Sequence, residues 1–534
     1  MMWRAGWTPL CLFGVAVGWT WPALVTPNLL GGRADALGTG WFVSAAARLA
    51  AGLHDPLTAW PEGADYLRPD SWTLIGVGAV SGWLPASRVV GLVAVLGVFF
   101  SAWAAEALAR SVGARAPWSM LAGVVYALSG LGSTSFIEGY PYHLADPWLP
   151  LCGLWWLRAV DRGGTPRHGL LAAGALALTA LTSAWHGLAG ALLVVGVLVV
   201  ARAGGRVGAR PVLAALGLLG AFALVVFLAS GSSGAAEVAA PGGAGGRADF
   251  LSRLLLHSAP APSIDIDARS QTAWFSSVGL ALVLVAPVLL GRDWKIRALV
   301  TVAVVSLLLA LIPLPWAWLD TFVPPASSGA LATLRSALGR FPERLGWAAL
   351  VAGGGVAARA LTELVDRHGR LAAPLLVVAA LECFVVLGHP GRQVATPGSA
   401  PAAYFATDGA VLDLWPEDLS PAPGWDLRIT NTGCFYQASH HRPIADICLL
   451  SPGVQSPRVV LGAWVTDLLF AGRVAEVAER LLAQKFATLA WHPDLFHGSA
   501  REVLRDALLQ LDPAPAQSKD AGDHVIAYQI GAPS

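Results

Sequence analysis

Long apolar runs separated by short polar loops make up most of the chain. Runs of about 20 apolar residues are long enough to cross a bilayer as helices. Their spacing predicts about eleven membrane-spanning helices within residues 1–391. They centre on residues 8–28, 86–110, 115–131, 143–160, 168–183, 185–203, 209–230, 272–290, 295–319, 343–363 and 371–388. No small-x-small cleavage site follows the first run, so we expect a retained span rather than a signal peptide.

The stretch 31–85, after the first run, is much more polar. We interpret it as the first extracytoplasmic loop. Within it, segments 39–53 and 73–84 are apolar but too short to span comfortably. They are expected to be interfacial helices that lie on the membrane.

The pattern changes again near residue 392. From there, short apolar runs typical of strands alternate with amphipathic stretches typical of helices. The predicted order is strand 411–414, helix 473–486, strand 487–491, helix 501–511 and strand 524–530. This alternation predicts a small α/β domain over residues 392–534.

Composition supports a mainly α-helical polytopic membrane protein. Hydrophobic residues make up 55% of the chain and charged residues 13%, against about 25% charged in an average soluble domain. The net charge of +1 gives no indication of a nucleic-acid partner. The lipid bilayer is the expected surrounding.

Basic residues gather in alternate loops. If the N-terminus is cytoplasmic, every predicted inside loop is short and basic, as the positive-inside rule requires. These loops hold Arg110, Arg115, Arg158, Arg162, Arg167, Arg202, Arg206, Arg210, Arg292, Lys295, Arg297, Arg367 and Arg370. The other loops hold most of the acids. With an odd number of spans, the C-terminal domain is then extracytoplasmic.

Two of the five cysteines, Cys434 and Cys448, fall in the polar C-terminal part. An extracytoplasmic location would allow a disulfide between them. Their spacing fits no common zinc pattern.

Asp35 is the first candidate for chemistry. It follows the first span closely, in a glycine-rich stretch that allows tight backbone turns. It is either a reacting carboxylate, a solvated loop acid, or a cap for a helix that begins near Thr39. Asp55 and Asp70 in the same loop are second-tier candidates that have the same structural alternatives.

Further candidates lie in later loops on the same predicted side. Glu138, Tyr140 and His143 fall in one aromatic loop, together with Asp146. Aromatic residues at such a boundary also form ordinary interfacial belts, so a structural and a functional interpretation both stay open.

Three more polar residues stand beside predicted spans. His186 occupies a very short turn, where a histidine is often a satisfied loop residue. Arg340 and Arg344 run against the inside-positive trend. They either bind a phosphate or lipid head group, or pair locally and snorkel.

Several motifs are missing from the sequence. It contains no P-loop, dinucleotide glycine fingerprint, His-x-x-x-His pair or Gly-x-Ser-x-Gly elbow. ATP-driven and flavin chemistry are therefore not indicated. No cofactor is expected, and a role for a divalent metal stays open.

A series of short motifs runs along nearly the whole chain. In order, they are Arg33-Ala34-Asp35, Asp55-Pro56, Trp60-Pro61-Glu62-Gly63, Tyr126-Ala127-Leu128-Ser129-Gly130, Gly139-Tyr140, Trp148-Leu149-Pro150-Leu151, Ser183-Ala184-Trp185-His186-Gly187, Arg340-Phe341-Pro342-Glu343-Arg344, Val411-Leu412-Asp413-Leu414, Tyr436-Gln437 and Arg442-Pro443-Ile444. In this order they resemble bacterial membrane proteins of the GT-C glycosyltransferase superfamily, in particular YfhO-like and related proteins. The chain departs from the resemblance at Ala34, where glycine is frequent, and at Tyr140, where histidine is frequent.

The resemblance implies a transferase in the bacterial inner membrane. It would move a sugar from a polyprenyl-phosphate donor to an extracytoplasmic glycan, lipid or envelope polymer. Asp35 would be the general base, and Arg344 or Arg340 would bind the lipid phosphate. Glu138, His143, His186, Tyr140 and Asp70 would line the substrate pocket.

Two other classes compete with this interpretation. A flippase for a lipid-linked glycan would place charges deep inside several spans, whereas here the acids cluster at one face. A non-catalytic envelope scaffold would not bring the candidate residues together.

Overall fold

A computed structural model gives the fold. It describes residues 7–21, 24–25, 34–52, 54–65, 76–79, 83–129, 146–205, 208–230, 277–291, 293–311, 345–371, 374–375, 377–378, 400–415, 425–446, 448, 457–496, 498–520 and 523–531. The chain is mostly helical, with one small sheet near its C-terminus.

Apolar helices occupy the positions of the predicted spans. They are α1 (Trp7–Thr20), α4 (Ala86–Ser111), α5 (Trp118–Ala127), α7 (Trp148–Val160), α8 (Pro166–Thr182), α9 (Ala184–Ala203), α10 (Ala209–Ser230), α12 (Ser277–Leu290), α13 (Trp294–Leu311) and α16 (Gly346–Arg367). Of the predicted span 371–388, only 371, 374–375 and 377–378 are described. Among the described residues, three helices are long and apolar enough to cross a membrane: Ala86–Ser111, His186–Ala203 and Gly346–Arg367.

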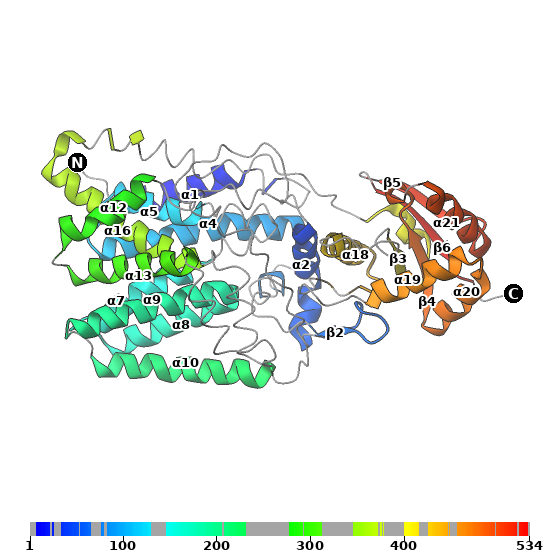
Figure 1. Cartoon of the computed structure of the whole chain (residues 1–534), viewed down its shortest axis with the longest axis horizontal. Helices are drawn as coiled ribbons and strands as arrows, with labels where there is room; N and C mark the ends of the chain where they lie inside the picture. The colour runs from blue at the N-terminus through cyan, green and yellow to red at the C-terminus, as the bar shows by residue number, and fades with distance from the viewer. Residues whose placement is uncertain are drawn as a thin grey trace.

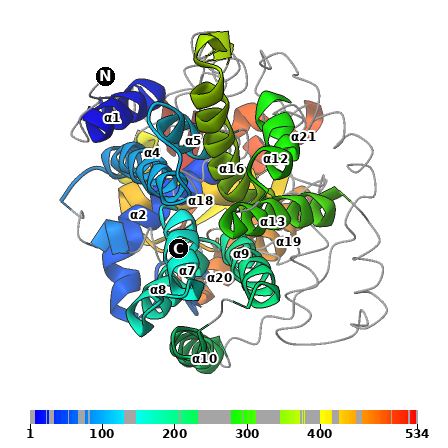
Figure 2. The ribbon, with the colours of Figure 1, turned by 90° about the vertical axis from the view of Figure 1, so that its left-hand side faces the viewer.

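The helices pack side by side as one bundle (Figure 1). Viewed along the bundle, α1 and α10 lie at its edge while α7, α9, α13 and α16 gather near the middle (Figure 2). The exposed leucines of α10, Leu213 and Leu216, agree with that edge position. Lipid is the solvent that suits such a surface.

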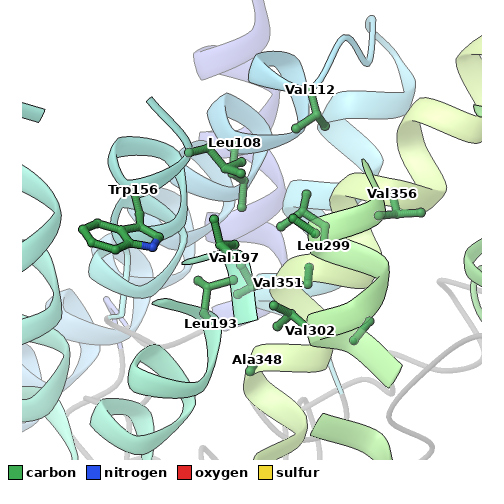
Figure 3. Close-up of a cluster of buried hydrophobic side chains, with 14 of the residues drawn as sticks. Leu108, Val112, Trp156, Leu193, Val197, Leu299, Val302, Ala348, Val351 and Val356 are labelled. Carbon is green, nitrogen blue, oxygen red and sulfur yellow. The ribbon is translucent and has the colours of Figure 1, made fainter. Parts of the chain in front are cut away.

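The centre of the bundle is aliphatic. Leu108 of α4, Leu193 of α9, and Leu299 and Val302 of α13 are buried in one cluster, which also contains Trp156 (Figure 3). Helices approach closely where glycines face a neighbour: a Cβ on Gly196 of α9 would lie 2.6 Å from Val302 Cγ2. Small residues at such contacts are what membrane helix packing favours.

Several basic loops gather at one end of the bundle. Lys295 Nζ lies 3.1 Å from the carboxylate of Asp161, and Arg115 contacts Asp366. These contacts join the ends of α7 and α16 to the starts of α13 and α5. Which side of the membrane this end faces stays a prediction.

Helix α2 (Ala34–Gly52) runs across the other end of the bundle, crosswise to α4 (Figure 1). It begins at Ala34, so the expectation of a helix starting near Thr39 is corrected. Asp35 is therefore inside the first turn and is not the N-cap. The positive end of the helix dipole favours an acidic residue there, which explains the earlier start. The interfacial roles of 39–53 and 73–84 stay predictions; of the second segment, 76–79 and 83–84 are described, and 76–79 are helical.

The C-terminal sheet has the strand order β3-β4-β6-β5. Its strands are β3 (Ala410–Leu414), β4 (Phe486–Trp491), β5 (Ala516–Asp520) and β6 (Asp523–Gln529). β3 and β4 are parallel, and the other pairs are antiparallel. Alternate side chains face opposite sides: Leu412 and Leu489 pack in one core, Val411 and Ala490 in the other.

Helices α19 (Pro457–Phe470), α20 (Val474–Ala483) and α21 (Gly498–Leu511) pack with the core that contains Leu412. On the other face lies α18 (Trp425–His440), between the sheet and α2 (Figure 1). We call strands β3–β6 with these four helices the C-terminal unit. Its strands β3, β4 and β6 and its helices α20 and α21 lie where the sequence predicted them. The possible disulfide between Cys434 and Cys448 is formed.

Candidate functional site

Asp35 occupies the second position of α2, in the helix's first turn. Its side chain lies outside the described part of the structure.

A buried polar cluster lies near the end of the bundle where α7 begins. Asp146 stands just before α7, and its Oδ1 accepts a hydrogen bond from Leu149 N at 3.2 Å. This is the pattern of a helix-capping carboxylate. Thr179 Oγ1 of α8 donates to the same oxygen at 3.4 Å, and the Tyr126 hydroxyl of α5 donates to the Asp146 carbonyl at 3.0 Å.

His186 completes this cluster from the first turn of α9. Its Nδ1 lies 3.7 Å from Asp146 Oδ2, and both side chains are 1% exposed. Trp347 of α16 packs edge-on against the imidazole, with ring centroids 4.7 Å apart. Asp146, Tyr126, Thr179, His186 and Trp347 thus join five helices; we call them the Asp146 cluster.

The Asp146 cluster has the chemistry of a carboxylate–imidazole pair. One carboxylate oxygen is used by the cap, while the other faces the imidazole beyond hydrogen-bond distance. A pair of this type can share a proton or accept a hydroxyl group between its members. It is also sufficient to fix α7 and α9 relative to each other, which is the structural alternative.

A second buried polar group lies at the carboxyl ends of the parallel strands β3 and β4. The Tyr404 hydroxyl donates to Asp413 Oδ1 at 2.5 Å, and His492 Nε2 lies 3.5 Å from the same oxygen. Trp415 stacks on His492 with ring centroids 3.7 Å apart. The carboxylate therefore ties the ends of two strands to the segment before β3.

His440 and Arg442 flank this group. The His440 ring stacks on Tyr404, and its Nδ1 accepts a bond from Arg442 N at 3.1 Å. Burial, reinforced by the positive charge of Arg442, lowers the pKa of His440 to about 3. Burial also lowers the pKa of Arg442, whose guanidinium donates to Thr407 O at 2.6 Å. His440 is thus held neutral in the fold.

Asp55 forms an ion pair with Arg48. Arg48 of α2 holds its carboxylate through two bonds of 3.1 and 3.0 Å, and Asp55 is fully buried. Such a bidentate pair fixes the turn after α2.

Most residues that the sequence singled out cannot be placed. Asp70, Glu138, Tyr140, His143, Arg340 and Arg344 lie outside the described residues. Of the residues to which the family resemblance gives a role in sugar transfer, only the backbone of Asp35 and the whole of His186 are described. The convergence of these residues therefore stays a prediction.

The structure adds partners that the sequence analysis did not link. Asp146 was noted only as one acid of its loop, and Thr179 and Trp347 were not singled out. One usable signal was present: Asp146 precedes Pro147, and an acid before a proline beside an apolar run is typical of a helix start.

No protein-family model and no curated protein sequence matches the chain. Solved structures do. The chain is similar to the arabinofuranosyltransferase AftD from Mycobacteria, at 16% identity and a TM-score of 0.57, over 100% of this chain and 40% of that one. A mutant of AftD gives a TM-score of 0.61 over 42% of its length. The archaeal oligosaccharyltransferase AglB from Archaeoglobus fulgidus is similar at 12% identity and a TM-score of 0.50, over 95% of this chain and 72% of that one.

These similarities identify the fold. The chain is a membrane protein with the fold of the GT-C membrane glycosyltransferases, mostly helical with a small C-terminal sheet. The resemblance expected from the sequence motifs is confirmed at that level. The chain spans about 40% of the length of AftD, so the activity of that whole enzyme is not thereby assigned to it.

Proposed function

We propose that the protein is a membrane glycosyltransferase that moves a sugar from a polyprenyl-phosphate donor to an extracytoplasmic glycan, lipid or envelope polymer. The observation that carries the proposal is the similarity to AftD over 100% of the chain, together with an acid in the first turn of the helix after the first span. The AglB structure contains dolichol-phosphate, which is a lipid carrier of the proposed class.

The proposal includes a topology. About eleven spans would cross a bacterial inner membrane, with the N-terminus in the cytoplasm. Helix α2, the Asp146 cluster and the C-terminal unit would then lie on or near the extracytoplasmic side. Residues 392–534 would form an extracytoplasmic α/β domain, in which a disulfide is chemically stable.

In the proposed reaction, the Asp35 carboxylate takes the proton of the acceptor hydroxyl. The hydroxyl oxygen forms a bond to the anomeric carbon as the bond from that carbon to the phosphate oxygen breaks. The electron pair of the broken bond leaves with the polyprenyl phosphate, a good leaving group that needs no strong general acid. Arg340 or Arg344 would stabilise its charge.

The remaining residues would bind substrate. Glu138, Tyr140, His143 and Asp70 would contact the sugar or the acceptor. His186 would contribute through the Asp146 cluster, where its imidazole lies beside a buried carboxylate. No step requires a bound cofactor, and a divalent metal is not assigned a role.

The first prediction tests the base. Asp35→Asn keeps the size of the side chain but cannot accept the proton. Because general-base catalysis contributes about 10²- to 10⁴-fold, sugar transfer by purified protein in detergent is expected to fall by that factor. Transfer is measured with a labelled polyprenyl-phosphate sugar and a mixed acceptor fraction.

Asp506→Asn is the matched control. Asp506 lies on the exposed face of α21, and its carboxylate pairs with the neighbouring Arg505, so transfer should be unchanged. Full activity of the Asp35→Asn protein at a normal expression level would remove Asp35 from the mechanism.

A further inference from the structure

Helix α2 is fixed by a buried contact to α18 of the C-terminal unit. The indole Nε1 of Trp41 donates to Gln437 Oε1 at 2.9 Å, and both side chains are fully buried. Trp41 and Phe42 also share a hydrophobic core with Cys434, Phe435 and Tyr436. The middle of α2 is therefore anchored to an element from the far end of the chain.

Among the described residues, Gln437 forms a hydrogen bond through its amide oxygen and not through its amide nitrogen. Indole nitrogen is a donor and never an acceptor, so Trp41 requires the oxygen of the amide. The opposite atom, Nε2, has no hydrogen-bond partner among the described residues. The Trp41 bond therefore depends on the amide oxygen of Gln437.

The turn after α2 is held by a second set of bonds. Arg48 fixes Asp55, and the next residues bond to the segment before Cys448: Ile444 N donates to Leu57 O at 2.9 Å, and Trp60 N to Ile444 O at 2.9 Å. Ala59 N donates to the Asp446 carbonyl at 2.7 Å. The turn is thus bonded to α2 through Arg48 and to the segment before Cys448 through its backbone.

The disulfide between Cys434 and Cys448 connects this segment to α18. Cys448 follows the segment that binds the turn, and Cys434 lies on α18 one helical turn before Gln437. Contacts therefore run from α2 to the turn and from the turn to Ile444 and Asp446. Cys448, two residues further on, is joined by the disulfide to α18, which bonds back to Trp41. This closed set limits both sliding and rolling of α2.

We propose that Gln437 is a positioning residue: its bond to Trp41 sets the orientation of α2 and so places Asp35 for sugar transfer. This inference rests on the proposed function. Trp41 lies six residues beyond Asp35, or about 9 Å along the helix axis. In a rigid helix, rotation at Trp41 carries the first turn with it.

The test removes each side of the bond. Gln437→Met removes the acceptor, Trp41→Phe removes the donor, and the double variant removes both. The double variant should unfold at or above the temperature of Trp41→Phe, because both carry the same cavity at position 41 but only the single variant leaves the buried Gln437 oxygen without its donor. The kcat of the double variant should nevertheless fall about 10- to 100-fold, since a misplacement of about 1 Å costs up to that factor. KM should change less than about twofold, because substrate contacts are retained.

Trp156→Phe is the matched control. Trp156 is also buried and donates from Nε1 to Val194 O at 2.9 Å, but it lies within the bundle, away from α2. The Trp156→Phe variant loses the same kind of indole hydrogen bond, so Val194 O no longer has Trp156 as a donor. We expect lower stability and an unchanged kcat.

Backbone hydrogen exchange of residues 34–40 gives a readout that is independent of activity. Exchange should be faster in Gln437→Met and in the double variant than in wild type or Trp156→Phe. Unchanged exchange, or a double variant with wild-type kcat, overturns the inference while leaving the proposed function intact. If wild-type protein transfers no sugar from any polyprenyl-phosphate donor, the proposed function fails. The inference that Gln437 positions Asp35 for sugar transfer then fails too, even if the exchange result shows that the contact holds α2.

Discussion

The helical bundle and the C-terminal unit bury charge very differently. In the described part of the bundle, the buried acids are Glu106 and Asp146, and the centre is otherwise aliphatic. The much smaller C-terminal unit buries Asp413, Asp446 and Arg458, together with His492.

The difference is what the proposed surroundings, lipid for the bundle and water for the C-terminal unit, would produce. Helices in lipid gain nothing from hiding apolar surface, so they associate through close packing of small residues. A unit folded in water gains from apolar burial and can offset the cost of a buried ion pair. A buried acid is therefore more informative in the bundle, and Asp146 beside His186 is the clearest case.

The largest expected effect tests the buried charge of the C-terminal unit. Arg458 Nε lies 2.8 Å from Asp446 Oδ1, and both side chains are almost completely buried. Arg458→Met leaves the carboxylate without this partner, which costs about 3–5 kcal/mol for a typical buried pair. Thermal unfolding of the detergent-solubilised chain should show the C-terminal transition at a markedly lower temperature.

Arg501→Met is its control. Arg501 pairs with Asp494 at 3.2 Å, but both side chains are well exposed, and such pairs contribute about 0–1 kcal/mol. Equal destabilisation by the two variants would mean that burial does not distinguish these ion pairs.

The next effect tests close packing in the bundle. A Cβ on Gly123 of α5 would lie 2.3 Å from the carbonyl oxygen of Ala102 in α4. Because backbone cannot move aside cheaply, Gly123→Ala should force the two helices apart. Overpacking of this kind costs about 1–3 kcal/mol, measured as a lower unfolding temperature in detergent.

Gly174→Ala makes the same change in α8, where a Cβ would meet nothing within 4 Å. It should be neutral or slightly stabilising, because alanine favours helix by about 1 kcal/mol over glycine. If both variants behave alike, the bundle does not depend on close approach at Gly123.

The sequence predicted the bundle better than the C-terminal unit for the same physical reason. A span needs a long apolar run, and each such run has a helix wherever it is described. In the C-terminal unit, α18, α19 and β5 were missed. The sequence of α18 has no apolar stripe; its buried residues contact α2 and the disulfide, which are remote in sequence. β5 is a polar edge strand, Ala516–Asp520, without alternation.

The candidate site was only partly accessible from sequence. His186 and Asp35 stood out as polar residues beside apolar runs. Their surroundings did not, because pairing of His186 with Asp146 and of Trp41 with Gln437 depends on tertiary packing. No spacing rule connects residues on helices that are distant along the chain.

The smallest expected effect tests whether the C-terminal unit depends on a neutral histidine. The pKa of His440 is about 3 in the fold, against about 6.5 in an unfolded chain. Above pH 6.5 both states are neutral. As pH falls from 6.5 toward 3, the unfolded chain binds a proton that the fold excludes, so stability is lost over that window. Between pH 7.5 and 5.5 the loss of unfolding free energy is at most about 1.4 kcal/mol.

The stability of His440→Asn should therefore depend less on pH than that of wild type. His368→Asn is the control, because His368 lies at the exposed end of the bundle helix α16; its pH dependence should match wild type. An equal slope in all three proteins would show that His440 is not kept neutral by the fold.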